Sequence, residues 1–348
     1  MKKMRFSLQP ETGTLSEADA KRYFSRVGLS VAVLMIVYYA AIVLVEIVLG
    51  ASAPWLMNYA VVQQLLSIVP LYGIAVPCFY AMLSALPRDA VQPDAMGRKN
   101  FFVVLCVAVA LMMVGSYLSN IIIVFVSVFF EASPVNPVEA ATVGQAWWIN
   151  LIFVGIVAPI LEELVFRKML CDRLLPLGEG YAVVLSGAIF GLVHGNFFQF
   201  FYAFALGAVF AFVYIKTGRI RYSIVYHALI NLTGGVLTPW LLERLEPVMQ
   251  DEFINEMMTL AQSGNVDAVS SMIAPHARPL MVLLIYDVLM MVALVCGLVF
   301  LFRRWKRVRL EKGLLPPPRE GRVANVFCNV GVAVALTVFT GIFVLSLL

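Results

Sequence analysis

Long apolar runs constrain the fold of this chain more than any other feature of its sequence. Nine runs approach or exceed the roughly 20 apolar residues that a helix needs to cross a lipid bilayer. They lie near residues 28–50, 62–87, 101–130, 147–172, 181–195, 196–215, 222–241, 279–302 and 323–348. Of the 348 residues, 61% are hydrophobic and only 13% are charged. The sequence therefore predicts an all-α, polytopic membrane helix bundle with about nine transmembrane helices, and it excludes a soluble domain.

Lysine and arginine residues predict how the chain crosses the membrane, because they collect in short cytoplasmic loops. With the N-terminus in the cytoplasm, 23 of the 25 basic residues fall in cytoplasmic segments, and only Arg244 and Arg278 fall outside. We therefore expect a multi-pass protein of the cell (plasma) membrane with a cytoplasmic N-terminus. The first 27 residues are polar with mixed charge, so we expect no cleavable signal peptide. The net charge is +4, and the basic residues behind it lie in these loops. We therefore expect the lipid bilayer, not nucleic acid, as a partner.

The chain divides into five predicted parts. These are a cytoplasmic N-terminal segment (1–27), three N-terminal transmembrane helices (28–130), a helical core (147–241), an outer loop (242–278), and two C-terminal transmembrane helices with a basic cytoplasmic linker (279–348). In the outer loop, apolar residues recur every three or four positions from Leu242 to Leu260, which predicts one amphipathic helix on the outer surface. We expect the basic linker, residues 303–322, to be solvated.

Ionisable side chains inside apolar helices are costly, and by default they mark function. Six polar side chains interrupt three runs of the core: Glu162, Glu163 and Arg167 in the fourth, His194 in the fifth, and His227 and Asn231 in the seventh. Glu163 and Arg167 are four residues apart, so they share a helix face and can neutralise each other at moderate burial. Glu162 lies about 100° from Glu163 around the helix axis, so its side chain is free to interact with a different group. Together these groups could polarise a water, take up its proton and stabilise an oxyanion.

A structural role is the alternative for the same side chains, since interhelical hydrogen bonds also hold membrane bundles together. Six such groups on three core helices favour a functional site over that alternative. Glu46 and Asp287 each stand alone in another run, and we expect them to be structural polar contacts or cavity-lining groups.

The order of these motifs resembles the CPBP family, the CAAX proteases and bacteriocin-processing enzymes also called Abi proteins. The resemblance rests on Glu162-Glu163-x-x-x-Arg167, Phe190-x-x-x-His194, His227-x-x-x-Asn231, and the run from Leu206-Gly207 to Tyr214-x-x-Thr217-Gly218. It covers roughly residues 147–240, about a quarter of the chain. It implies that 147–241 is a catalytic core and that the chain is an intramembrane endopeptidase, a CAAX protease-like hydrolase. The implied substrate is a membrane-associated or lipidated peptide or protein.

The resemblance also implies a role for each motif residue. These roles are water activation for Glu162 and His194, oxyanion stabilisation for His227 and Asn231, and bracing of the helix for Glu163 and Arg167. The family has been called metalloprotease, and Glu162, His194 and His227 would then be the ligands of a Zn²⁺ ion. Glutamate and histidine can also activate water without a metal, and the residues leave both mechanisms open.

Two functions of other classes compete with the endopeptidase. One is a non-catalytic membrane scaffold or immunity protein of the same fold, which the intact motifs disfavour. The other is a proton- or metal-coupled transporter, since intramembrane glutamate and histidine also build proton relays. The sequence shows neither an inverted repeat nor paired broken helices, which disfavours the transporter.

The depth of the site sets a condition on the fourth and fifth helices. Glu162 and His194 can meet only if the fourth helix, kinked near Pro159, continues to about residues 172–175. A tight turn over 177–180 should follow, and then a short fifth helix that ends at Gly195. We expect the site near mid-membrane, reached through a water-filled cavity from the cytoplasmic side.

Overall fold

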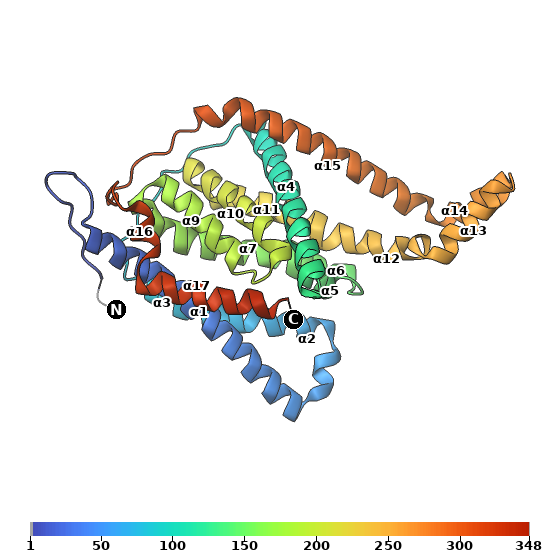
Figure 1. Cartoon of the computed structure of the whole chain (residues 1–348), viewed down its shortest axis with the longest axis horizontal. Coiled ribbons are helices and arrows are strands. Elements are labelled where there is room, and N and C mark those ends of the chain that lie inside the picture. The colour runs from blue at the N-terminus through green and yellow to red at the C-terminus, as the bar shows by residue number, and fades with distance from the viewer. Residues whose placement is uncertain (1–2, 348) are drawn as a thin grey trace.

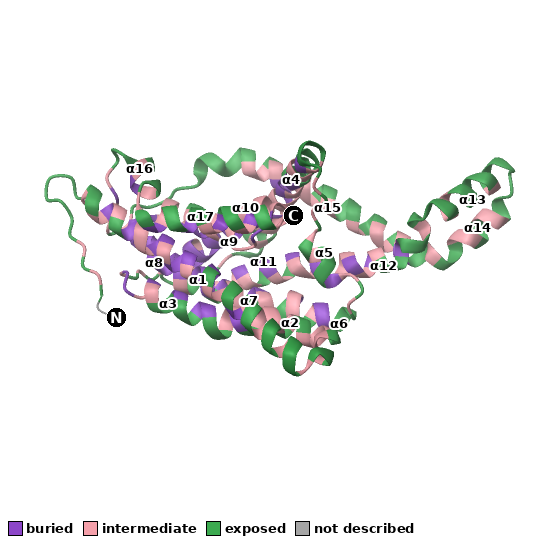
Figure 2. Cartoon of the chain, turned by 60° about the horizontal axis from the view of Figure 1, so that its bottom comes forward, coloured by how far each residue is buried: buried purple, intermediate pink, exposed green. Residues whose placement is uncertain are grey.

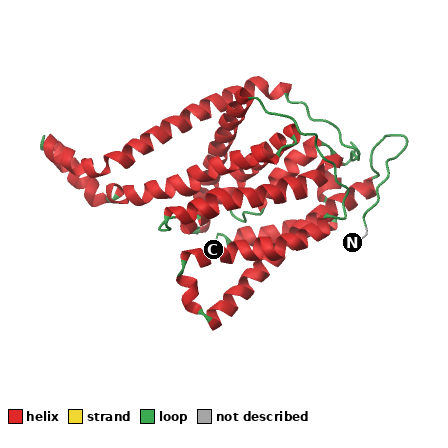
Figure 3. Ribbon diagram, turned by 180° about the vertical axis from the view of Figure 1, so that it is seen from behind, coloured by secondary structure: helices red, strands yellow, loops and turns green. Residues whose placement is uncertain are grey.

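The computed structural model describes residues 3–347, and it is built almost entirely from helices (Figures 1 and 3). Among these residues the only β-pairings are two isolated antiparallel bridges, Leu8 with Leu15 and Gly178 with Lys312. The predicted all-α class is therefore confirmed.

The α-helices share the labels of Figure 1. They are α1 (Glu17–Ser52), α2 (Ala60–Ile68), α3 (Val76–Leu83), α4 (Arg98–Phe130), α5 (Pro137–Thr142), α6 (Trp147–Asn150), α7 (Ala158–Glu163), α8 (Asp172–Leu174), α9 (Glu179–Leu192), α10 (Phe197–Thr217), α11 (Ile220–Leu232), α12 (Thr238–Met249), α13 (Asp251–Gln262), α14 (Val266–Ile273), α15 (Ala277–Arg304), α16 (Arg322–Phe327) and α17 (Val330–Leu345). Segments of π-helix are η2 (Val69–Ala75), η3 (Leu151–Val157), η4 (Leu164–Cys171) and η6 (Thr233–Leu237). Turns of 3-10 helix are η1 (Pro54–Asn58), η5 (Leu175–Leu177), η7 (Ala274–His276) and η8 (Trp305–Arg307).

Several of these segments join end to end into helices that are long and apolar enough to cross a membrane. Within residues 3–347 there are seven: 17–52, 60–83, 98–130, 147–177, 197–217, 220–249 and 266–307. Two shorter apolar helices, α9 and α17, complete the set. With 14 residues α9 is about 21 Å long, which is less than the ~30 Å hydrocarbon core. The polytopic bundle is confirmed, whereas the count of nine spans and the cytoplasmic N-terminus stay predictions.

Helices α9 and α10 pack along each other at the centre of the bundle because glycines let their backbones approach. A Cβ atom at Gly187 would lie 2.8 Å from the backbone nitrogen of Ala208, and one at Gly207 would lie 2.9 Å from the Cβ of Phe190. On its other side α10 packs against α4, where a Cβ at Gly115 would lie 2.6 Å from the Cα of Tyr202. These contacts hold α9 at a fixed position in the core.

The first and last helices, α1 and α17, also pack together, although they are far apart in the sequence (Figure 1). A Cβ at Gly28 would lie 2.5 Å from the backbone of Gly331, and one at Gly331 would lie 1.8 Å from the carbonyl oxygen of Ser25. Ser25 Oγ also accepts a hydrogen bond from the Gly331 N–H at 3.0 Å. The two backbones touch here, so no side chain larger than hydrogen fits at either glycine.

The fourth membrane helix runs continuously from Trp147 to Leu177, which confirms its predicted inward extension. The predicted turn is also confirmed: η5 ends at Leu177, and Gly178 has φ +122°, a backbone conformation that favours glycine. The fifth helix ends earlier than predicted, at Leu192, because Gly195 has φ +69° and its N–H closes a turn onto Leu192 O. Near Pro159 the helix widens into π-turns.

The prediction of one amphipathic helix over Leu242–Leu260, in the outer loop, is wrong. The seventh membrane helix continues through α12 to Met249, and the backbone then breaks at Gln250, whose ψ is 140°. Beyond it α13 and α14 form a helical hairpin around Gly264, which has φ +72°. This hairpin projects from the bundle, and its residues are exposed or half-buried (Figure 2).

The basic linker differs from its prediction in one stretch, because residues 311–316 are docked and not solvated throughout. The N–H of Glu179 donates to Glu311 O at 3.1 Å, and the N–H of Leu315 donates to Pro176 O at 2.6 Å. The linker backbone therefore lies against the turn between the fourth and fifth helices.

Candidate active site

Proline changes the geometry of the fourth helix where the two glutamates lie. Pro159 has no N–H, and its ring would clash with the carbonyl one turn earlier in a regular α-helix. The turn before it is π-helical, and the N–H of Ala158 donates to Phe153 O, five residues back. A second π-segment, η4, follows directly after Glu163. The glutamate pair thus lies on a six-residue α-helix between two π-segments, a distortion that is frequent at functional sites.

Asn231 is placed by the same proline. Its Nδ2 donates to the carbonyl oxygen of Val154 at 2.9 Å. In a π-helix that carbonyl would pair with the N–H of residue 159, and proline has none. The side chain of Asn231 therefore supplies the missing donor and joins α11 to the fourth helix.

Glu163 and Arg167 form the predicted ion pair, but not at moderate burial: both side chains are 0% exposed. Arg167 Nε donates to Glu163 Oε2 at 2.8 Å, and Nη2 donates to Oε1 at 3.2 Å. A third donor, Nη1, reaches Ser186 Oγ on α9 at 2.6 Å, and Ser186 in turn donates to Phe166 O. A buried charge is tolerated only when it is paired and hydrogen-bonded, and this arrangement meets both conditions.

His227 lies between the two glutamates. Its Nδ1 is 3.2 Å from Glu163 Oε1, and its Nε2 is 3.7 Å from Glu162 Oε2. Because a carboxylate can only accept, Nδ1 carries the proton of the Glu163 contact. A neutral imidazole would then turn the lone pair of Nε2 toward a second acceptor, Glu162. At 3.7 Å the two groups are too far apart for a direct hydrogen bond, but they would form an ion pair if His227 carried a second proton.

His194 lies in the turn after α9, and its ring is fixed by its own helix. Its Nδ1 is 2.7 Å from the carbonyl oxygen of Phe190, which can only accept. The proton is therefore on Nδ1, and a neutral His194 keeps the lone pair of Nε2 for another group. The Phe190 ring packs against both imidazoles, with centroid distances of 5.0 Å to His194 and 5.6 Å to His227.

Aromatic rings enclose the charged pair and the imidazole. The guanidinium of Arg167 lies 5.5 Å from the Phe190 ring and 6.0 Å from the Phe210 ring. The Phe210 ring is buried and stacks on His227 at 5.4 Å. These rings exclude water and strengthen the electrostatic contacts within the cluster.

The structure thus brings together Glu162, Glu163, Arg167 and His227, and sets His194 on the same phenylalanine ring. Of the two glutamates only Glu162 is accessible, with 21% of its side chain exposed against 0% for Glu163. Asn231 directs its amide nitrogen to a backbone carbonyl instead of Glu162 or His227.

Other predicted features lie outside this cluster. Glu46 and Asp287 are exposed on α1 and α15. Two cavities lie at opposite ends of the fourth helix, and neither is lined by Glu162, His194 or His227. The predicted cytoplasmic route to the site stays a prediction.

The donor set for zinc can be compared with this geometry. The residue types fit, and the contact of Glu163 with His227 Nδ1 resembles the outer carboxylate that orients a metal-bound histidine. However, across residues 3–347 no three histidine, cysteine, aspartate or glutamate side chains are grouped so that they could hold a metal ion. The zinc ligand set of Glu162, His194 and His227 stays a prediction.

Sequence reasoning missed Ser186 and Phe210. A signal for Ser186 was present, because Ser186, Phe190 and His194 follow one another at intervals of four and lie on one face of the fifth helix. Ser186 is thus a polar residue two turns before His194 on the same stripe. Phe210 offers no comparable signal, since it is one of many aromatics in an apolar helix.

The site lies within the part of the chain that matches known proteins. Residues 144–233 match the family described as type II CAAX prenyl endopeptidase Rce1-like. This segment is similar to the CAAX proteases, and the resemblance to the CPBP family predicted from its motifs is confirmed. No solved structure matches the chain significantly.

Three known proteins are similar to part of the chain. YdiL of Bacillus subtilis is 35% identical over 105 residues, which are 30% of this chain and 41% of YdiL. The membrane-embedded CAAX protease MroQ of Staphylococcus aureus is 30% identical over 129 residues, 35% of this chain and 52% of MroQ. The human CAAX prenyl protease 2 is 33% identical over 100 residues, 23% of this chain and 30% of the human protein. The chain therefore spans only a third to a half of the relatives it matches.

Proposed function

We propose that the chain is a membrane endopeptidase that hydrolyses a peptide bond in a membrane-associated or lipidated peptide or protein. The observation that carries this proposal is the chain of contacts from Arg167 through Glu163 to His227 and Glu162. An imidazole held between a neutralised carboxylate and an accessible one is suited to proton transfer. Similarity to the CAAX proteases supports the same reaction class.

The reaction assigns a separate task to each side chain. Glu162 takes a proton from a water whose other hydrogen is held by the Nε2 lone pair of His194. The resulting hydroxide attacks the scissile carbonyl carbon. His227, carrying protons on both nitrogens, donates its Nε2–H to the oxyanion that forms. Glu162 then passes its proton to the leaving nitrogen as the C–N bond breaks, which yields a carboxylic acid and an amine.

The remaining residues act by positioning. Glu163 stabilises the doubly protonated His227, and Arg167 neutralises Glu163 so that the cluster does not carry excess negative charge. Asn231 holds α11 against the widened turn of the fourth helix and so sets the height of His227, four residues earlier on α11. No step is assigned to a metal ion.

The proposal is tested by comparing membrane peptidomes of cells that express the wild-type chain, Glu162→Ala or Glu256→Ala. Glu256 is an exposed glutamate on the projecting hairpin, so its loss controls for a change of charge. We expect one or more precursors to accumulate with Glu162→Ala alone and thereby to identify the substrate. Identical peptidomes for the wild type and Glu162→Ala, at equal amounts of protein in the membrane, would instead indicate a non-catalytic scaffold.

A further inference from the structure

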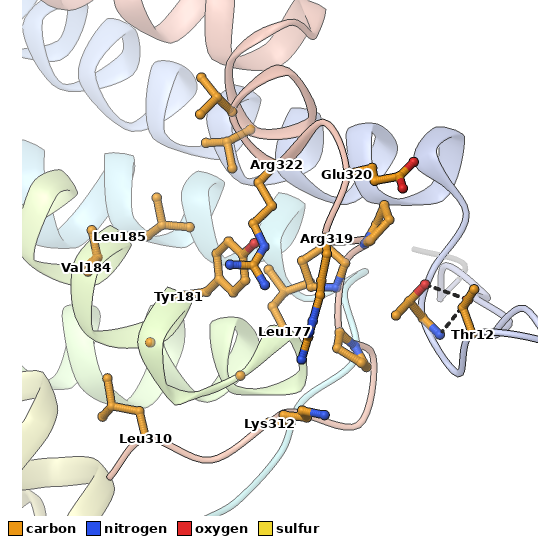
Figure 4. A pocket seen from close by; sticks show the side chains of 18 of the residues that line it. Thr12, Leu177, Tyr181, Val184, Leu185, Leu310, Lys312, Arg319, Glu320 and Arg322 are labelled. Carbon is orange, nitrogen blue, oxygen red and sulfur yellow. Dashed lines mark hydrogen bonds between the residues drawn. The ribbon is translucent and has the colours of Figure 1, made fainter. Parts of the chain in front are cut away.

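One of the two cavities lies where the fourth helix turns into the fifth, away from the glutamate–histidine cluster (Figure 4). Its volume is about 1110 Å³, comparable with the upper range of known ligand sites. Three separate parts of the chain form its walls: residues 9–14, residues 177–185 and residues 310–327. It contains none of the residues placed in the proposed reaction.

Backbone hydrogen bonds hold these walls together, so the cavity is preformed. The linker pairs with the turn through Glu311 O and the Leu315 N–H, and its Pro316 carbonyl accepts from the Leu15 N–H at 2.8 Å. At Gly313 the linker lies so close to the turn that a Cβ would come 2.1 Å from Pro176 O. The linker therefore fastens the N-terminal segment and the start of α9 to each other.

Cationic side chains line the cavity without partners. Lys312, Arg319 and Arg322 make no side-chain hydrogen bond or ion pair with any group in residues 3–347. Two acidic residues, Glu311 and Glu320, also line it, yet neither pairs with an arginine. In Figure 4 Arg322 extends beside Tyr181 into the cavity, whereas Glu320 points away from it. Two arginine side chains that line one cavity without a partner suit a bound phosphate.

The cavity also has an apolar lining, part of which is exposed. Val184 on α9 is 53% exposed, and Val323 and Phe327 on α16 are 73% and 53% exposed. Leu185 and Val326 belong to the same lining. Cationic side chains together with an exposed apolar lining match an amphipathic molecule better than a free ion or a wholly polar peptide.

We propose that this cavity binds an anionic phospholipid. Its phosphate lies against Arg319 and Arg322, with Lys312 beside them, and one acyl chain follows Val184 and Val323 into the bilayer. The face concerned carries the basic residues that the positive-inside rule places in the cytoplasm, and anionic lipids are enriched in that leaflet. The lipid thereby fills the space between the linker and α9, the helix whose end carries His194.

The test is retention of lipid by the purified full-length chain, measured by native mass spectrometry. The protein is taken from vesicles of phosphatidylcholine mixed with phosphatidylglycerol. We compare the wild type with Arg319→Gln/Arg322→Gln and with the control Arg307→Gln/Arg309→Gln, which removes the same charge from linker residues outside the cavity. Wild type and control should retain phosphatidylglycerol in preference to phosphatidylcholine, and the cavity variant should retain about tenfold less of it.

Two further arms separate a lipid site from other occupants. Val184→Asn alters only the apolar lining, and it should reduce retention while it leaves the arginines in place. Added inorganic phosphate should not displace the lipid. Equal losses in both arginine variants, displacement by phosphate alone, or no preference between the two lipids in the wild type would each overturn the proposal.

Discussion

The fourth and eighth membrane helices are both long and apolar, yet they differ in what they bury. In the fourth, 39% of the apolar stretch is buried within the protein, against 6% in the eighth. The fourth is interrupted by two π-segments and holds Glu163 and Arg167 fully buried, whereas α15 is a regular 28-residue helix. Its one internal carboxylate, Asp287, is exposed.

This difference indicates that a charged residue in a membrane helix belongs to a functional site when it has charged or hydrogen-bonding partners and lies beside a distortion of the helix. Asp287 has neither, whereas Glu163 has Arg167, His227 and a π-turn directly after it. Hydropathy alone treats both helices as membrane spans. Matched substitutions in the two helices therefore test this difference.

The largest effect is expected for Glu163→Ala, which leaves the Arg167 guanidinium buried without its counter-ion. The free energy of unfolding should fall by about 3–5 kcal/mol. For Asp287→Ala, in the eighth helix, we expect a change of less than about 0.5 kcal/mol. Denaturant unfolding in detergent, followed by helical circular dichroism, measures both values.

A double variant separates stability from activity at the same pair. Glu163→Leu/Arg167→Met replaces both charges with apolar groups of similar size, so it should recover most of the stability without recovering hydrolysis. Equal losses of unfolding free energy for Glu163→Ala and Asp287→Ala would contradict the conclusion that the two carboxylates differ in structural importance.

A smaller effect is expected for Ser186→Ala, which removes one acceptor from Arg167. The free energy of unfolding should fall by about 1–3 kcal/mol, and kcat should fall about tenfold while KM stays unchanged, because His227 is held less firmly. Ser271→Ala, on the projecting hairpin, serves as the control, since its hydroxyl bonds only to its own helix. A rise in KM with unchanged kcat would place Ser186 in substrate binding instead.

The Asn231 bridge to Val154 predicts an energetic coupling with Pro159. Asn231→Ala should cost about 1 kcal/mol in the wild type, since it leaves the Val154 carbonyl without a donor. In a Pro159→Ala background residue 159 regains an N–H, so the cost should shrink by about 0.5 kcal/mol or more. Pro279→Ala, at the start of α15, should not couple with Asn231. Identical costs in all three backgrounds would refute the assignment of Asn231 to the proline-freed carbonyl.

The smallest expected effect is that of a zinc chelator. Because no step is assigned to a metal, hydrolysis of the substrate identified with Glu162→Ala should be unchanged by 1,10-phenanthroline. Loss of activity that added Zn²⁺ restores would contradict this and favour Glu162, His194 and His227 as ligands.

Spacing along the sequence predicted the features that depend on neighbouring residues. The break at Gly195-Asn196 is real, since the Asn196 side chain accepts from the Gln199 N–H at 2.9 Å and caps α10. The Glu163–Arg167 pair followed from an interval of four residues. The extension of the fourth helix to about residues 172–175 was predicted by requiring two side chains at one depth, and the helix ends at Leu177.

What the sequence did not predict depends on contacts between distant segments or on departures from α-helical geometry. Because the fourth helix is π-helical before Pro159, the carbonyl of Val154 has no N–H partner within its own helix. Asn231 on α11 donates to this carbonyl, which in a regular α-helix would accept from an N–H four residues later. The linker carries charge and prolines like a solvated loop, and only its pairing with Pro176 and Glu179 reveals that it is docked. Near Gln250, the apolar residues keep their spacing of three or four although the helix is interrupted, and no nearby residue type predicts the interruption.

The backbone contact of Gly28 with Gly331 has a consequence for biosynthesis. Helix α1 emerges from the ribosome first, but about 300 further residues are made before α17 can pack against its backbone at Gly28. Until then the surface of α1 at Gly28 is open to lipid or to another helix. A nascent chain arrested before residue 330 should therefore be a substrate for quality-control proteases, even though every motif of the candidate active site has already been translated.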